Sequence, residues 1–248
     1  MASPAPRLKS WYAKEEKIKA NLFSGDDTLE SFGTIILLCA VVAVVSYLVG
    51  SFNMAIIISK YHKSRDIRNY GSGNAGMTNM LRTFGRKAAA YTFGGDFFKG
   101  ALAVALARMA VSNFELPFDM GYVAAIFVVV GHIFPLYFKF RGGKGVATAF
   151  GAMLVLNWAA FLALLIGLVP MVFIIRIVSA VSLCGASLYP VLTFLMLYLQ
   201  GENMLTTVIP DTIFSLILSG LTFYAHRENI ARLRNGTENF FGDKKNEK

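Results

Sequence analysis

Long apolar stretches without a charged residue constrain the fold of this chain more than any other feature. Residues 31–59, 145–175 and 177–201 contain no Asp, Glu, Lys or Arg, and each exceeds the roughly 20 residues that a helix needs to cross a bilayer. With 55% hydrophobic and 16% charged residues, the chain cannot hide its apolar surface in an ordinary water-soluble core. We therefore expect an all-α, multi-pass membrane protein in contact with a lipid bilayer.

The apolar runs predict seven transmembrane helices, near residues 33–59, 88–111, 120–137, 145–157, 159–175, 177–199 and 207–225. The run 145–175 fits one long helix or two short ones. We divide it at Asn157 and Trp158, because a single crossing would put the acidic connection 200–211 on the side of the basic loops. The first of the two helices is then unusually short, which is tolerated where a helix lines a protein cavity.

Loop charges predict the orientation in the membrane. Basic residues dominate 60–87 and 137–144, whereas 112–120 and 200–211 contain acidic residues but no Lys or Arg. By the positive-inside rule the basic loops face the cytoplasm, so the N-terminus is expected outside and the C-terminus in the cytoplasm. We divide the chain into an N-terminal surface leader (1–32), an integral membrane domain (33–238) and a polar C-terminal tail (239–248).

Three basic clusters border these apolar stretches. The first cluster is GSGNAGMTNMLR (71–82), the second is GHIFPLYFKFRGGKGVAT (131–148) and the third is HRENIARLRNGTE (226–238). Glycine frees backbone N–H groups, while Ser, Asn, His, Arg and Lys supply donors and charge, which together suit a phosphate group.

Each cluster also has a plainer interpretation. The first, with Ser72, Gly73, Asn74, Asn79 and Arg82 as candidate donors, is either an anion nest or an interfacial turn. The second places Gly142, Gly143, Lys144 and Gly145 before an apolar helix, which favours anion binding, although Lys144 alone fits a snorkelling lysine. In the third, His226 and Asn229 share a helical face, as a site or as an ordinary cap.

Four further polar residues lie within or at the ends of predicted helices. Asp96 and Lys99 are three residues apart and can pair inside the bundle, either to order a cavity or to contact a substrate. A lone histidine such as His132 is more often structural than catalytic, and we expect Arg108 to snorkel outward.

Several classes of function lack a signal. No histidine has a metal-ligand spacing, no Walker A sequence or Gly-x-Ser-x-Gly elbow is present, and the basic residues accompany no nucleic-acid-binding motif. We therefore expect no metal, no cofactor, no nucleic-acid partner and no obligate protein partner.

Taken in order, the three clusters resemble the motifs of the bacterial acyl-phosphate:glycerol-3-phosphate acyltransferase family, over about residues 49–238. The resemblance implies a seven-helix enzyme of the bacterial inner (plasma) membrane with its active site on the cytoplasmic side. The substrates would be acyl phosphate and glycerol 3-phosphate, and the product 1-acylglycerol 3-phosphate.

Residue by residue, the resemblance assigns catalytic or substrate-binding roles to positions in all three clusters: Ser72, Asn74, Arg82, Lys144, His226 and Asn229, with the glycines of the second cluster as a phosphate loop. The proton acceptor is either His226 or the phosphate of the donor. The alternative function is a transporter or channel for organic phosphates, which a one-sided distribution of anion sites disfavours.

Overall fold

The structure is a computed structural model and describes residues 25–114 and 116–240. All regular structure in these residues is helical, and the chain forms two compact units, one up to Val41 and the other from Val42 onward. The second unit contains all three clusters. Most of the predicted leader lies outside the described residues, and its last part belongs to helix α2 (Gly25–Gly50). Of the predicted tail, only residues 239 and 240 are described.

The apolar run 33–59 is interrupted near its end. Helix α2 ends at Gly50 and helix α3 spans Met54–Lys63. The break arises because Asn53 caps α3: its side chain accepts a hydrogen bond from Ile56 N at 3.1 Å, and an N-cap residue has non-helical backbone angles. Together these helices still provide one candidate membrane span, Phe32–Tyr61.

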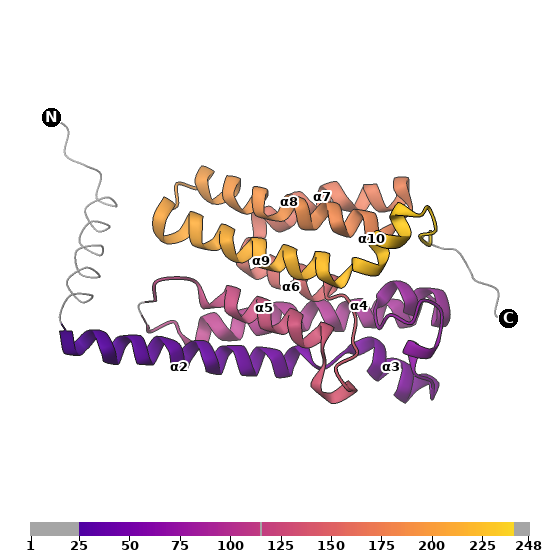
Figure 1. Cartoon of the computed structure of the whole chain (residues 1–248), viewed down its shortest axis with the longest axis horizontal. Coiled ribbons are helices and arrows are strands. Elements are labelled where there is room, and N and C mark those ends of the chain that lie inside the picture. The colour runs from indigo at the N-terminus through magenta and orange to yellow at the C-terminus, as the bar shows by residue number, and fades with distance from the viewer. Residues whose placement is uncertain (1–24, 115, 241–248) are drawn as a thin grey trace. The chain divides into compact units, whose positions relative to one another are not determined.

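Seven further helices follow (Figure 1): α4 (Met77–Ala110), α5 (Met120–Ile133), α6 (Val146–Leu156), α7 (Trp158–Ile175), α8 (Val178–Leu199), α9 (Ile209–Ala225) and α10 (Arg227–Arg234). Five segments of the described chain are long and apolar enough to cross a membrane: Phe32–Tyr61, Met120–Phe138, Trp158–Ile175, Val178–Leu199 and Met204–Ala225. These segments support the predicted membrane character of the chain, whereas the count of seven spans stays a prediction.

Helices α4 and α6 are the two predicted spans outside this set of five. Helix α4 begins at Met77, inside what was predicted as loop, and kinks at Gly85, where φ is 84°. Helix α6 has 11 residues, or about 16 Å at 1.5 Å per residue, half of a hydrocarbon core of about 30 Å. The predicted break at Asn157 is confirmed: its side chain caps α7 by accepting from Ala160 N at 3.0 Å.

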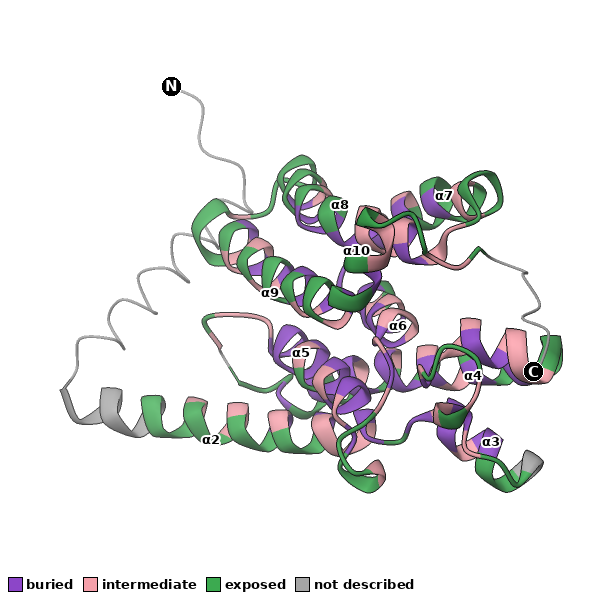
Figure 2. Ribbon diagram, turned by 45° about the vertical axis from the view of Figure 1, so that its right-hand side comes forward, coloured by how far each residue is buried: buried purple, intermediate pink, exposed green. Residues whose placement is uncertain are grey.

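The buried centre of the second unit is α5, which is mostly purple in Figure 2 and packs against α4, α6 and α9. Helices α4 and α6 approach each other closely through two glycines. A side chain on Gly100 of α4 would collide with the backbone of Thr148, and one on Gly151 of α6 with the backbone of Phe97. Small residues permit such contact between membrane helices, and here they fix α6, whose first turn belongs to the second cluster, against α4.

Candidate active site

The second cluster folds back on the end of α5. Gly142 N donates to Ile133 O at 3.1 Å, and Gly143 N donates to His132 O at 3.2 Å. A side chain on Gly143 would collide with the carbonyl of Ala75 and with the imidazole of His132. Gly145 has a φ of 77° and caps α6, a left-handed conformation that glycine adopts without steric cost. The turn therefore places Lys144 at the N-terminal end of α6.

These bonds change how the second cluster can bind an anion. The sequence suggested that glycine amides would be free for phosphate, but Gly142 and Gly143 already use theirs within the turn. The remaining donors are the Lys144 ammonium and the N–H groups of the first turn of α6, which lack helical partners and lie at the positive end of the helix dipole. Phosphate contact by Gly142 and Gly143 stays a prediction that requires those two bonds to open.

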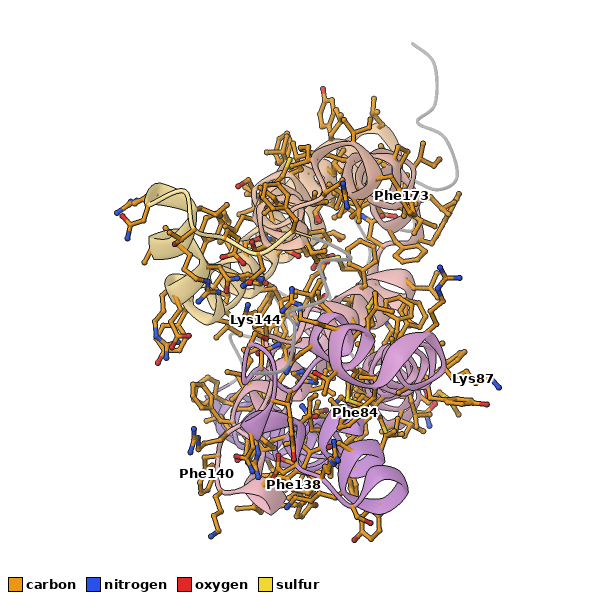
Figure 3. The ribbon with its side chains drawn as sticks, turned by 90° about the vertical axis from the view of Figure 1, so that its right-hand side faces the viewer. Phe84, Lys87, Phe138, Phe140, Lys144 and Phe173 are labelled. Carbon is orange, nitrogen blue, oxygen red and sulfur yellow. The ribbon has the colours of Figure 1, made fainter. Side chains whose placement is uncertain are left out.

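The third cluster meets the second at Lys144, whose Nζ donates to Asn229 Oδ1. Asn229 Nδ2 donates to both carboxylate oxygens of Glu238 at 3.1 Å. Arg232 Nε lies 3.0 Å from Glu238 Oε2 and completes the chain of contacts. In Figure 3, Lys144 lies between the yellow C-terminal segment and the purple helices of the earlier chain. Glu238 and Arg232 were not predicted as site residues; the available signal was an acid at the end of a cluster that contains three arginines.

Burial shifts the protonation of two groups at this junction. Burial, with a further contribution from the nearby Arg232, lowers the pKa of Lys144 from 10.5 to about 8. His226 is 2% exposed, and burial followed by the Lys144 charge lowers its pKa to about 4. Near neutral pH the site therefore holds an ammonium group beside an uncharged imidazole.

The tautomer of His226 follows from its hydrogen bond. Its Nδ1 lies 2.8 Å from the carbonyl oxygen of Thr222, and a carbonyl only accepts hydrogen bonds. We infer that Nδ1 carries the proton, which leaves the lone pair on Nε2. His226 thus offers an acceptor for a hydroxyl group.

The first cluster is organised around Asn79, which is 1% exposed. Asn79 Oδ1 accepts from Ser72 N at 3.0 Å, while its Nδ2 donates to Tyr70 O at 2.9 Å and to Asn74 O at 3.1 Å. All of its polar atoms are engaged inside the loop. The geometry therefore supports a structural role for Asn79, and its contact with substrate stays a prediction.

The three clusters are joined to different degrees. The carbonyl of Ala75, in the first cluster, borders Gly143 of the second and accepts from Asn53 Nδ2 at 3.3 Å. The side chains of the second and third clusters form one group: Lys144, His226 and Asn229. Within the described residues, three polar side chains of the first cluster form no hydrogen bond or ion pair with that group: Ser72, Asn74 and Arg82.

Behind the turn lies a buried polar cluster. Lys99 Nζ is 2.8 Å from Asp96 Oδ1 and 3.0 Å from His132 Nδ1, and it also donates to Phe52 O at 2.8 Å. The predicted pairing of Asp96 with Lys99 is confirmed. Because the His132 ring borders Gly143, this cluster supports the turn from inside the bundle.

Comparison with known proteins adds independent information. The family described as "Glycerol-3-phosphate acyltransferase" matches residues 40–236. The protein of that name from Thermoanaerobacter pseudethanolicus is 41% identical over 203 residues, covering 82% of this chain and 95% of the relative. The corresponding Clostridioides difficile protein is 41% identical over 206 residues, covering 83% of this chain and 96% of the relative.

A solved structure is similar as well. It is the crystal structure of PlsY (YgiH), an integral membrane glycerol 3-phosphate acyltransferase, in its glycerol 3-phosphate form. The TM-score is 0.69 at 32% identity, with 82% of this chain and 96% of that chain covered. Its lysophosphatidic acid form gives a TM-score of 0.68 at 30% identity, with 82% and 95% covered.

Proposed function

Since this chain belongs to the glycerol-3-phosphate acyltransferase family, we propose that it transfers a fatty acyl group from acyl phosphate to the sn-1 hydroxyl of glycerol 3-phosphate. The products are 1-acylglycerol 3-phosphate (lysophosphatidic acid) and inorganic phosphate, and the reaction begins membrane phospholipid synthesis. Acyl phosphate is a mixed anhydride and already activated. The enzyme therefore needs mainly to orient two reactants and to stabilise the departing phosphate.

The contact of Lys144 with Asn229 carries this proposal, because it joins two clusters, each predicted to bind phosphate, across 85 residues of sequence. Lys144, Ser72 and the first turn of α6 would hold the acyl phosphate, whose leaving group is anionic. Arg82, His226 and Asn229 would hold glycerol 3-phosphate. Arg82 is partly exposed on the first turns of α4, where its guanidinium can grip a phosphate with two hydrogen bonds.

In the reaction, the hydroxyl oxygen of glycerol 3-phosphate attacks the carbonyl carbon of the donor. The bond between that carbon and the bridging oxygen breaks, the electron pair leaves on phosphate, and the hydroxyl proton passes to the phosphate. A pKa of about 4 makes His226 a weak base at neutral pH, and general bases work best with a pKa near the working pH. We therefore assign His226 to orienting the hydroxyl through Nε2.

The His226→Gln variant separates the two proton routes. Donor-assisted transfer predicts that the change acts mainly on KM for glycerol 3-phosphate. A loss of kcat of about 10²- to 10⁴-fold at unchanged KM, which is typical of a missing general base, would instead assign the proton to His226.

We propose that α4 and α6 complete seven spans, with the N-terminus outside, the C-terminus inside and the site on the cytoplasmic face of the bacterial inner membrane. The charges that exclude α4 from the apolar set include Asp96 and Lys99, which pair inside the bundle rather than facing lipid. Impermeant thiol labelling tests this arrangement: a cysteine at Thr237 should be protected in intact cells and one at Glu202 should react. Labelling with the reverse pattern would overturn it.

The function itself is tested by reconstitution into lipid vesicles with acyl phosphate and labelled glycerol 3-phosphate. We expect labelled lysophosphatidic acid, and loss of that product in Lys144→Ala. Turnover with acyl-CoA in place of acyl phosphate would correct the donor. Uptake of labelled glycerol 3-phosphate without acylation would favour the transporter alternative.

A further inference from the structure

Arg68 connects the basic loop 60–87 with the basic loop 137–144. It lies in the 3-10 turn η1 (Ile67–Asn69), just before the first cluster. Its Nη1 donates to Phe138 O at 2.8 Å and to Arg141 O at 3.0 Å. These two carbonyls belong to the second cluster, and Arg141 directly precedes the turn that carries Lys144.

The segment between those two carbonyls has an unusual backbone. Lys139 has a φ of 59° and Phe140 a φ of 55°, a left-handed conformation that non-glycine residues rarely adopt and that persists only where surrounding contacts impose it. Figure 3 labels Phe138 and Phe140 on this loop, away from Lys144. Phe140 N donates to Pro135 O at 3.0 Å within the segment. The two Arg68 hydrogen bonds bracket both left-handed residues and connect the segment to the preceding loop.

Arg68 is itself fixed in place. Asp66 Oδ1 accepts from both the backbone N and the Nε of Arg68 at 3.0 Å, and Asp66 Oδ2 accepts from Nη2 at 2.7 Å. The Arg68 side chain is only 16% exposed. Its hydrogen bond lowers the pKa of Asp66 to about 2, so the ion pair persists throughout the physiological pH range. This rigid fork leaves Nη1 free to bridge the loops.

We propose that Arg68 is a positioning residue for the acyl phosphate site: it fixes the segment 138–141 and thereby the placement of the Lys144 turn. The inference rests on the proposed function, in which Lys144 binds the phosphate of the donor. It predicts that weakening Arg68 loosens donor binding without altering the chemistry or the acceptor site.

The test is Arg68→Lys, which keeps the charge but replaces a planar fork with a point charge that cannot maintain both the Asp66 pair and the two carbonyl bonds. We expect KM for acyl phosphate to rise at least about tenfold, the equivalent of one charged hydrogen bond, with kcat and KM for glycerol 3-phosphate within about twofold of wild type. Trypsin should also cut faster after Lys139 and Arg141 while the thermal midpoint of the protein is retained.

The matched control is Arg65→Lys. Arg65 is an exposed cation in the same loop that stacks over Tyr70 at 5.6 Å but donates no side-chain hydrogen bond to another described residue. Its variant should match wild type in every measurement. An equal effect of Arg65→Lys would show that replacing any guanidinium in this loop weakens donor binding, and it would overturn the specific role of the Arg68 bridge.

A normal KM for acyl phosphate in Arg68→Lys, or unchanged trypsin cleavage, overturns the inference. Should that variant fail to fold, Asp66→Asn decides, since it loosens Arg68 without removing it and should raise the same KM to a smaller extent. Wild type serves in the same assay as the reference: if it does not use acyl phosphate at all, the proposed function has failed rather than the role of Arg68.

Discussion

The alkaline limb of the activity profile should belong to Lys144. Its pKa of about 8 lies well below the ordinary 10.5, so the free enzyme loses the ammonium group that we propose to bind the donor phosphate as pH rises. The protonated fraction falls from about 91% at pH 7 to about 9% at pH 9, where an ordinary lysine would remain about 97% protonated. We therefore expect kcat/KM for acyl phosphate to drop about tenfold between these pH values and tenfold more by pH 10.

The assay is initial-rate formation of lysophosphatidic acid in reconstituted vesicles from pH 7 to 10, with non-enzymatic donor hydrolysis subtracted. kcat/KM is the right parameter because it reports the pKa values of the free enzyme. Phosphate monoesters titrate near pH 6, below this window, so the substrates do not contribute a limb of their own.

Lys144→Arg is the matched control, since a guanidinium does not titrate below about pH 12. We expect this variant to start from a lower kcat/KM, because Arg cannot reproduce the contact with Asn229, but to stay flat up to pH 10. A wild-type profile without a fall between pH 8 and 10, or the same fall in Lys144→Arg, would refute the reasoning.

Three further predictions concern the support of the site. Asp96→Asn leaves Lys99 buried without its carboxylate and should cost about 3–5 kcal/mol of stability, measured as the thermal midpoint in detergent; adding Lys99→Met should recover part of the loss. Gly143→Ala should lower kcat/KM at least tenfold through collision with Ala75, whereas Gly94→Ala, which meets no neighbour, should remain active and gain up to about 1 kcal/mol. Asn79→Ala removes the bonds that shape the first cluster and should expose that loop to proteolysis with loss of activity; an intact loop would contradict its structural role.

Features set by neighbouring residues in the chain were predictable. The pairing of Asp96 with Lys99 follows from spacing along a helix, which is a local property. The break at Asn157 was predicted from the charges of the connecting loops. The apolar runs likewise indicated membrane helices from composition and length alone.

Features that depend on distant contacts were not predictable. The amide of Gly143 donates to the carbonyl of His132. Some backbone N–H groups of this glycine-rich segment are therefore used within the turn and are not free to bind an anion. Glu238 gains its importance only because Asn229 meets Lys144 across 85 residues. Sequence patterns indicate which residue types are available to a site, but which of their polar atoms remain free depends on the tertiary contacts.

Arg108 is the clearest correction, because it does not simply snorkel outward. It pairs with Asp119 and donates to the carbonyl groups of Val155 and Leu156. Those carbonyls end helix α6, where the last turn of a helix has acceptors without partners. Within a membrane such acceptors are costly to leave unpaired, and Arg108 satisfies those at the end of α6.

In the proposed topology, this arrangement makes the depth of the candidate site a property of the protein rather than of the lipid. A helix that spans the bilayer adjusts its tilt to membrane thickness, but α6 is held at one end by Arg108 and along its side by the glycine contacts with α4. Lys144 lies one residue before the N-cap of α6, so its position is fixed together with that of the helix. In the proposed topology, the site would therefore keep a constant height above the membrane centre while the acyl composition, and with it the thickness, of the surrounding bilayer changes.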